Sequence, residues 1–379
     1  MTSNSPSANP APPPRGNPFT PGAVITSRDK FFGRKRELSE IKARLKGMLS
    51  VSVVGEARIG KSSLLKVLEA ELRQWPDYLP IYLSMDSYGT QAGFCRILLE
   101  KLLPHVVPPT GKEQVLRALE GRVEQQDESL TFEGTAKVIE WAHASGLRVV
   151  LLLDEFKDLL EKADEFDDAF LGQLRSLYNT NRTLALVLAT RQSITTIPQL
   201  KAYFANGIIM QELKELLPSE ARALLEQPHD RPFSPQEVDL GLQVGKKHPL
   251  RLQSAGFWLY YWKGQADNPL YSAPGHLHIN RYNILNQKVQ HEYEQAMAAS
   301  QESNERIHDI GDSLNRGTQW LNRSIVQPIR GLIEFIANNQ GNLAAILFLL
   351  VIVVSVLSFL GIIPTDTVKE LLNWIKEGL

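Results

Sequence analysis

The sequence predicts an α/β protein built on a parallel sheet, and three observations lead to this prediction. Five short apolar runs lie between residues 49 and 213, and four of them show no regular alternation of polar with apolar positions. Parallel strands that are covered on both faces have this pattern, whereas half-exposed strands alternate. Segments with helical spacing separate the runs, as crossover helices do in a parallel sheet. A glycine-containing turn joins the first run to the helix after it.

The chain begins with a segment rich in proline, serine and asparagine, so we expect a disordered leader over residues 1–24. This leader lacks the apolar stretch of a secretory signal, and we expect the catalytic part of the protein to stay inside the cell. Its single cysteine, Cys95, excludes an internal disulfide framework and cysteine-rich zinc sites. The 41 basic and 42 acidic side chains leave a formal charge of −1, so charge alone names no partner.

The core domain is expected over residues 25–212. Helix-spaced Leu38, Ile41 and Leu45 precede the first apolar run, which predicts a helix followed by a buried strand. The five runs that we interpret as strands are Leu49–Val54, Leu79–Met85, Leu147–Glu155, Thr183–Arg191 and Asn206–Leu213.

The octapeptide GEARIGKS fits the phosphate-binding pattern G-x-x-x-x-G-K-[ST], and it stands between a predicted strand and a predicted helix. Gly55 and Gly60 let the backbone curl so that successive N–H groups point into one concavity, to which the helix N-terminus adds positive partial charge. We expect Lys61 to reach the β- and γ-phosphates and the Ser62 hydroxyl to ligate Mg²⁺. Ser63, beside them, is included among the nucleotide-binding residues.

Two acidic residues end the third apolar run, where a P-loop protein needs carboxylates. We expect Asp154 to hold Mg²⁺ through water, and Glu155 to orient or deprotonate an attacking water. Arg191 ends the fourth run and is a candidate for neutralising the γ-phosphate, with a surface role left equally open. The candidate catalytic residues are therefore Glu155, Lys61 and Arg191.

Six motifs stand in the order seen in prokaryotic STAND-type NTPases, which are relatives of AAA+ and Orc1-like ATPases: NPFTPG, FFGRKREL, GEARIGKSSLL, LLLDEF, LALVLATR and GKKHPLRLQ. The chain resembles this family from about Asn17 to Leu259. The resemblance implies a P-loop core of five parallel strands, a helical lid that closes over the nucleotide, and ATP with Mg²⁺ as ligands.

The resemblance also implies roles for single residues. It places Arg34, within the motif Phe-Gly-Arg, beside the nucleotide base, and it makes Arg191 the sensor of the γ-phosphate. Pro249 of the lid is expected to touch the adenine or the ribose. His248, just before it, is either part of that contact or a loop histidine in the extended backbone that precedes proline.

The lid is expected over residues 213–275, because Ser or Pro helix starts and helix-spaced Leu and Ala recur there. Its last segment carries an aromatic cluster (Trp258, Tyr260, Tyr261 and Trp262) that we interpret as helix packing, since no basic stripe accompanies it. A helical stalk is expected over residues 276–342.

A membrane anchor is predicted near the C-terminus. The 20 residues from Ala344 to Ile363 carry no charge, and as a helix they span a hydrocarbon core of ~30 Å once. We expect a transmembrane helix over residues 343–363 and an amphipathic tail over 364–379. Because ATP and Mg²⁺ are cytosolic, the expectation is a single-pass protein of the cell membrane with its NTPase domain in the cytoplasm.

Three classes of function follow from these expectations. The first is a membrane-anchored switch that binds ATP, hydrolyses it slowly and changes conformation or oligomeric state, as STAND relatives do in signalling or defence. The second is an AAA+-like ATPase that remodels a membrane partner, and the third is a passive nucleotide-bound scaffold. We expect a homo-oligomer and a protein partner or sensor of unknown identity. Nucleic acid is disfavoured as a partner, because no basic recognition segment is visible.

Overall fold

The computed structural model describes residues 16–156, 165–180, 182–196, 198–204, 206–265 and 281–300. All of these belong to one unit, Met1–Glu305; a second unit comprises Arg306–Leu379. Most of the stalk expected over 276–342, the transmembrane helix expected over 343–363 and the tail expected over 364–379 lie outside the described residues. Within the described residues, no helix combines the length and the apolar character that crossing a bilayer requires.

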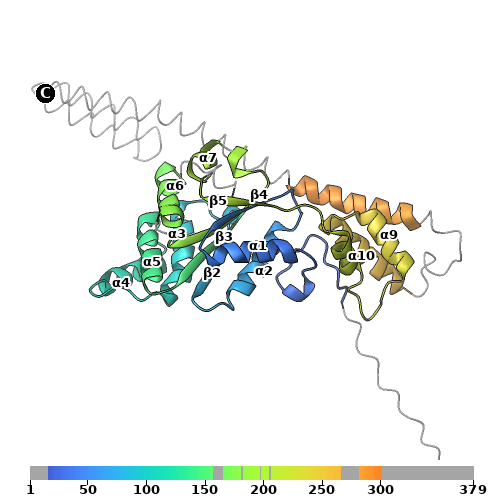
Figure 1. Cartoon of the computed structure of the whole chain (residues 1–379), viewed down its shortest axis with the longest axis horizontal. Helices are drawn as coiled ribbons and strands as arrows, with labels where there is room; N and C mark the ends of the chain where they lie inside the picture. Colours follow the sequence, from blue (N-terminus) through green and yellow to red (C-terminus); the bar gives the residue numbers. More distant parts are fainter. Residues whose placement is uncertain are drawn as a thin grey trace, which may run out of the picture. The chain divides into compact units, whose positions relative to one another are not determined.

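The sheet has five parallel strands in the order β2-β3-β4-β1-β5, which confirms the predicted fold class (Figure 1). Each of the five apolar runs forms one strand. The strands are β1 (Ser50–Val54), β2 (Tyr78–Ser84), β3 (Arg148–Asp154), β4 (Leu184–Thr190) and β5 (Ile208–Glu212). The registers align Val54 with Thr190 and Ser84 with Asp154, so the carboxyl ends of four strands lie at one edge of the sheet.

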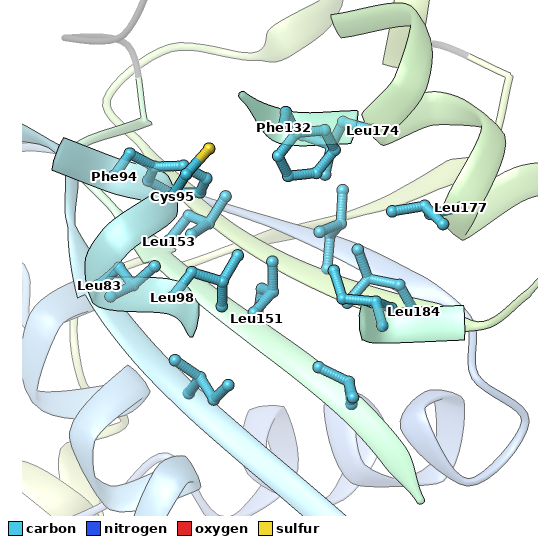
Figure 2. Close-up of a cluster of buried hydrophobic side chains, with 14 of the residues drawn as sticks. Leu83, Phe94, Cys95, Leu98, Phe132, Leu151, Leu153, Leu174, Leu177 and Leu184 are labelled. Atoms are coloured by element: carbon cyan, nitrogen blue, oxygen red, sulfur yellow. The ribbon is translucent and has the colours of Figure 1, made fainter. Parts of the chain in front are cut away.

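Helices cover both faces, which explains why most of the strand sequences are apolar without regular alternation. On β3, Val150 and Leu152 face a core cluster with α1 and α2, whereas Val149, Leu151 and Leu153 face a second cluster. Figure 2 shows this second cluster, in which strand leucines meet Phe94 and Leu98 of α3, Phe132 of α5 and Leu174 of α6. The helices of the core are α1 (Lys35–Lys46), α2 (Lys61–Leu72), α3 (Gln91–Leu102), α4 (Glu113–Glu124), α5 (Phe132–Ala144), α6 (Asp168–Arg175) and α7 (Pro198–Phe204).

A lid of three helices follows β5: α8 (Pro218–Leu225), α9 (Pro235–Gly245) and α10 (Pro249–Lys263). Each begins with proline, which is favourable because the first helical residue needs no N–H donor. Tyr260 and Trp262 are buried in lid clusters while Tyr261 is 47% exposed, so most of the aromatic cluster serves packing as expected.

The start of the expected stalk packs on the lid. Residues 281–300 form a helix, drawn in orange in Figure 1. Its Leu285 and Val289 are buried against Val244, Ala255 and other residues of α9 and α10. The expected stalk was to begin at residue 276. Its helix over 281–300 packs on the lid instead of standing free from it.

The disordered leader expected over residues 1–24 is too long. Residues 16–25 form an ordered segment, which we call the strap, and Phe19 within it is 1% exposed. The Phe19 ring stacks on Phe233 with 5.8 Å between centroids, and it lies against Gly256 of α10. Composition predicted disorder over residues 1–24 because proline, serine and asparagine are frequent there, yet the buried Phe19 side chain packs residues 16–25 against the lid.

Candidate nucleotide-binding site

The loop between β1 and α2 has the backbone that the glycine pattern predicts. Gly60 has a φ of +100°, and a Cβ on Gly55 would lie 2.9 Å from both the Ile59 side chain and the Leu213 carbonyl oxygen. The loop therefore requires glycine at both positions. Its curl leads directly into α2, so backbone N–H groups of the first turn are available to an anion.

Lys61 lies inside this loop with only 5% of its surface exposed. Its ammonium donates hydrogen bonds to the carbonyl oxygens of Gly55 (2.8 Å) and Glu56 (2.9 Å). Burial lowers the pKa of Lys61, and the nearby carboxylates of Glu155 and Asp154 oppose this shift. The ammonium thus lies near two carboxylates and lines the cavity described below, where it could bind a phosphate.

The ends of β3 and β4 bring together the predicted acids and the arginine. Asp154 is 2% exposed and accepts a hydrogen bond from the Glu155 N–H (3.0 Å), while Glu155 adopts a positive φ of 47°. The Arg191 guanidinium lies 3.8 Å from the Glu155 carboxylate and donates a hydrogen bond to the Ser300 carbonyl (3.3 Å). Arg191 therefore joins the carboxyl-terminal edge of the sheet to the end of the helix over 281–300.

A cavity of about 340 Å³ lies over this edge, a volume within the range of small-molecule sites. Its walls come from the P-loop, the strand ends, the strap, the lid and the end of the helix over 281–300. The predicted site residues that line it are Arg34, Gly60, Lys61, Ser62, Ser63, Glu155, Arg191 and Pro249. Gly55 and Asp154 do not line it: Ile59 and Leu213 cover Gly55, and Asp154 is 2% exposed.

Arg34 was expected beside the nucleotide base, but its hydrogen-bonding groups contact other protein groups. The buried guanidinium pairs with Glu37 (3.0 Å) and donates to the carbonyl oxygens of Ile59 (3.2 Å) and Lys214 (2.5 Å). Its backbone N–H donates to Glu220 of α8 (3.0 Å). Arg34 thus ties the P-loop, α1 and the lid together at the wall of the cavity.

The strap also connects the lid to the P-loop. At its start, the Thr20 N–H donates to the Gln253 side chain of α10 (3.0 Å). At its end, the Ile25 N–H donates to the Ser63 hydroxyl of α2 (3.0 Å). The Ser63 hydroxyl, which was expected to bind nucleotide, accepts this hydrogen bond from the strap. Sequence reasoning missed the strap residues, and the motif NPFTPG was their only signal.

His248 does not line the cavity. It is 5% exposed, its ring meets Tyr293 edge to face with 5.2 Å between centroids, and neither ring nitrogen has a hydrogen-bond partner in the described part of the chain. Burial lowers the pKa of His248 to about 4. It is therefore a neutral packing residue between the lid and the helix over 281–300, while Pro249 faces the cavity.

The donor set suits Mg²⁺ in the manner usual for nucleotide sites. Within the described residues no group of three or more His, Cys, Asp or Glu side chains is placed to form a closed metal cage. Ser62 offers a hydroxyl and Asp154 a carboxylate at the same edge of the sheet. Mg²⁺ characteristically binds one or two such protein oxygens together with substrate phosphates and water.

Comparison with known proteins identifies the type of domain that contains the P-loop. A family model described as an AAA domain matches residues 44–197. This segment is a P-loop NTPase domain of the AAA type. The matched residues contain the P-loop, Asp154, Glu155 and Arg191 but neither the strap nor the lid, so those parts rest on the structure alone.

Solved structures resemble this chain at low sequence identity. The Walker-type ATPase of Pyrococcus abyssi has a TM-score of 0.51 at 13% identity, covering 75% of this chain and 79% of that one. The ORC2 protein of Aeropyrum pernix, solved in ADPNP-ADP complexes, has a TM-score of 0.48 at 13% identity, covering 71% and 72%. At 13% identity, the likeness to the Pyrococcus abyssi ATPase concerns the fold only. A search among curated proteins found no sequence match.

Proposed function

We propose that the protein is a membrane-anchored molecular switch that binds ATP with Mg²⁺ and hydrolyses it slowly to ADP and phosphate. In this proposal, nucleotide binding changes the arrangement of core, lid and the helix over 281–300. The change is then passed to the C-terminal segment. The resemblance to STAND-type NTPases and the fold of the AAA-type domain support a nucleotide as the ligand.

The observation that carries the proposal is the double engagement of Arg191. Its guanidinium faces Glu155 on one side and donates to the Ser300 carbonyl on the other. A hydrogen bond from arginine to a phosphate oxygen is charge-assisted and stronger than one to a neutral carbonyl. A γ-phosphate within reach of Arg191 would therefore compete with the end of the helix. ADP lacks that phosphate, so the two nucleotides would bias the helix differently.

Several of the predicted site residues then have a chemical role. Lys61 and the N–H groups that begin α2 would hold the β- and γ-phosphates, and Pro249 with the strap would enclose the nucleoside. Glu155 would orient the attacking water and accept its proton, since it is the cavity-lining carboxylate at the end of β3. A Mg²⁺ ion held by Ser62 and Asp154 would neutralise charge on the transferred phosphate.

The output of the switch is proposed from the sequence. The uncharged run from Ala344 to Ile363 would anchor the chain as a single span, with the NTPase domain in the cytoplasm. The helix over 281–300 precedes this span in the chain. In this proposal, a change in the docking of the helix is passed along the intervening residues to the membrane span. We also propose self-association as part of the response, and a protein partner or sensor as the source of the signal.

Hydrolysis measurements on the full-length protein in nanodiscs test this proposal, with wild type, Lys61→Ala, Glu155→Gln and Arg191→Ala compared. We expect Lys61→Ala to lose nucleotide binding, Glu155→Gln to bind but not hydrolyse, and wild type to complete a single turnover with slow release. Rapid steady-state turnover in wild type would instead indicate a remodelling ATPase. Binding that is unaffected by Lys61→Ala would contradict the proposed site.

A further inference from the structure

Asp154 is fixed from two sides. Its Oδ1 accepts a hydrogen bond from the Glu155 N–H (3.0 Å), and its Oδ2 accepts one from the Tyr82 hydroxyl (2.9 Å). The carboxylate is 2% exposed, so these two donors replace much of the hydration that an exposed carboxylate would have. A carboxylate with one donor on each oxygen cannot rotate without losing one of them.

Tyr82 is built to hold that position. It lies on β2, which pairs with β3 in a register that places Tyr82 beside Leu152, two residues before Asp154. The ammonium of Lys66, on α2, lies over the Tyr82 ring, 3.4 Å from the ring centroid. Lys66 in turn pairs with Glu69 (3.3 Å).

The phenolic hydroxyl of Tyr82 is the donor in its hydrogen bond with Asp154, because an ionised carboxylate can only accept. Tyr82 belongs neither to the P-loop nor to the acidic pair Asp154 and Glu155, and it lies about 20 residues beyond the P-loop.

We propose that Tyr82 is a positioning residue for Mg²⁺: its hydroxyl holds the Asp154 carboxylate in the orientation that the metal site needs. This inference rests on the proposed function, because it assumes that Ser62 and Asp154 serve a nucleotide-bound metal. Partners that orient metal ligands typically change metal affinity by 10- to 100-fold when they are removed. For one neutral hydroxyl we expect a change of about tenfold.

Tyr78 supplies a matched control. It lies on the same strand, it is also half-buried, and its hydroxyl donates to the Leu45 carbonyl (3.2 Å) at the opposite end of the strand from Asp154. Tyr78→Phe therefore removes a comparable hydroxyl from β2 without touching the metal site. An effect shared by both variants would be structural, whereas an effect of Tyr82→Phe alone belongs to Asp154.

The experiment measures metal dependence of binding and needs no turnover. A fluorescent ADP analogue is titrated in the absence of metal and at increasing Mg²⁺, and bound Mn²⁺ is followed by electron paramagnetic resonance. The proteins are wild type, Tyr82→Phe, Tyr78→Phe, Asp154→Asn and the double variant Tyr82→Phe/Asp154→Asn. We expect Tyr82→Phe to raise the half-saturating Mg²⁺ about tenfold and to leave metal-free affinity unchanged.

The double variant decides the mechanism. If Tyr82 acts through Asp154, then Tyr82→Phe has no further effect on metal affinity in the Asp154→Asn background. A wild-type Mg²⁺ dependence in Tyr82→Phe, or an equal loss in Tyr78→Phe, would overturn the role of Tyr82 while leaving the nucleotide site intact. Wild type that binds nucleotide without any metal dependence would overturn the metal part of the proposed function, and this inference with it.

Discussion

Replacing Phe19 by alanine tests whether the strap is an integral part of the lid. Phe19 is 1% exposed, it stacks on Phe233, and its ring fills the space over Gly256. A buried Phe→Ala change costs about 3–5 kcal/mol, because apolar contact is lost and a cavity remains. We expect a loss near the lower value, about 3 kcal/mol, since the strap is short and can partly collapse into the space.

Thermal unfolding followed by calorimetry measures this loss. For a domain of this size, 1 kcal/mol shifts the midpoint by roughly 2–4 °C, so Phe19→Ala should lower it by roughly 6–12 °C. The control is Thr26→Ala, an exposed position just beyond the strap that should stay within about 0.5 kcal/mol of wild type. Nucleotide affinity should fall as well, because Ala23, Val24 and Ile25 line the cavity. An unchanged midpoint in Phe19→Ala would refute the packing of the strap on the lid.

Two further predictions concern the joint between core and lid. Gly33 and Gly22 have nearly equal φ angles (+76° and +77°), but a Cβ on Gly33 would lie 2.8 Å from the Glu220 side chain, whereas one on Gly22 meets nothing within 4 Å. Both alanine variants should lose about 1–2 kcal/mol from backbone strain, and chemical denaturation should show a larger loss for Gly33→Ala; equal losses would contradict the Gly33–Glu220 contact. His248 has its pKa lowered by burial from 6.5 to about 4, so the unfolded chain binds the extra proton first and stability falls as pH drops from 6.5 to 4. The loss from this group is about 3 kcal/mol, and the unfolding free energy of His248→Leu should be less dependent on pH by that amount, a flattening whose absence would contradict the buried neutral histidine.

The sheet and the P-loop could be predicted from the sequence because their signals are local. A strand covered on both faces can be apolar at successive positions, as β4 is from Leu184 to Ala189 with every residue buried. The P-loop needs glycine where Gly55 and Gly60 stand, and its context of strand and helix is contiguous in the chain. The carboxylates at the end of β3 followed from the same reasoning, since they directly end a buried strand.

The contacts that join the parts could not be predicted, because they connect residues far apart in the chain. Phe19 lies in a proline-rich context that predicts disorder, yet its ring packs against Phe233 and Gly256, which are more than 200 residues away in the chain. Tyr82 looks like any strand aromatic until the register of β2 and β3 brings it to Asp154. The docking of the helix over 281–300 likewise includes the buried Leu285 and Val289, which helical periodicity alone did not assign to a partner.

The distance between the core and the helix over 281–300 is the measurement to make for the switch itself. Cys95 is fully buried and burial raises its pKa to about 12, so spin labels react selectively with cysteines introduced at exposed Ser39 of α1 and exposed Ala298. The labelled protein, with Glu155→Gln to prevent hydrolysis, is measured by double electron–electron resonance with Mg-ADP and with Mg-ATP. We expect the distance distribution to shift or broaden with Mg-ATP and to stay narrow with Mg-ADP. Identical distributions in the two nucleotides, both being bound, would contradict competition between the γ-phosphate and the Ser300 carbonyl for Arg191.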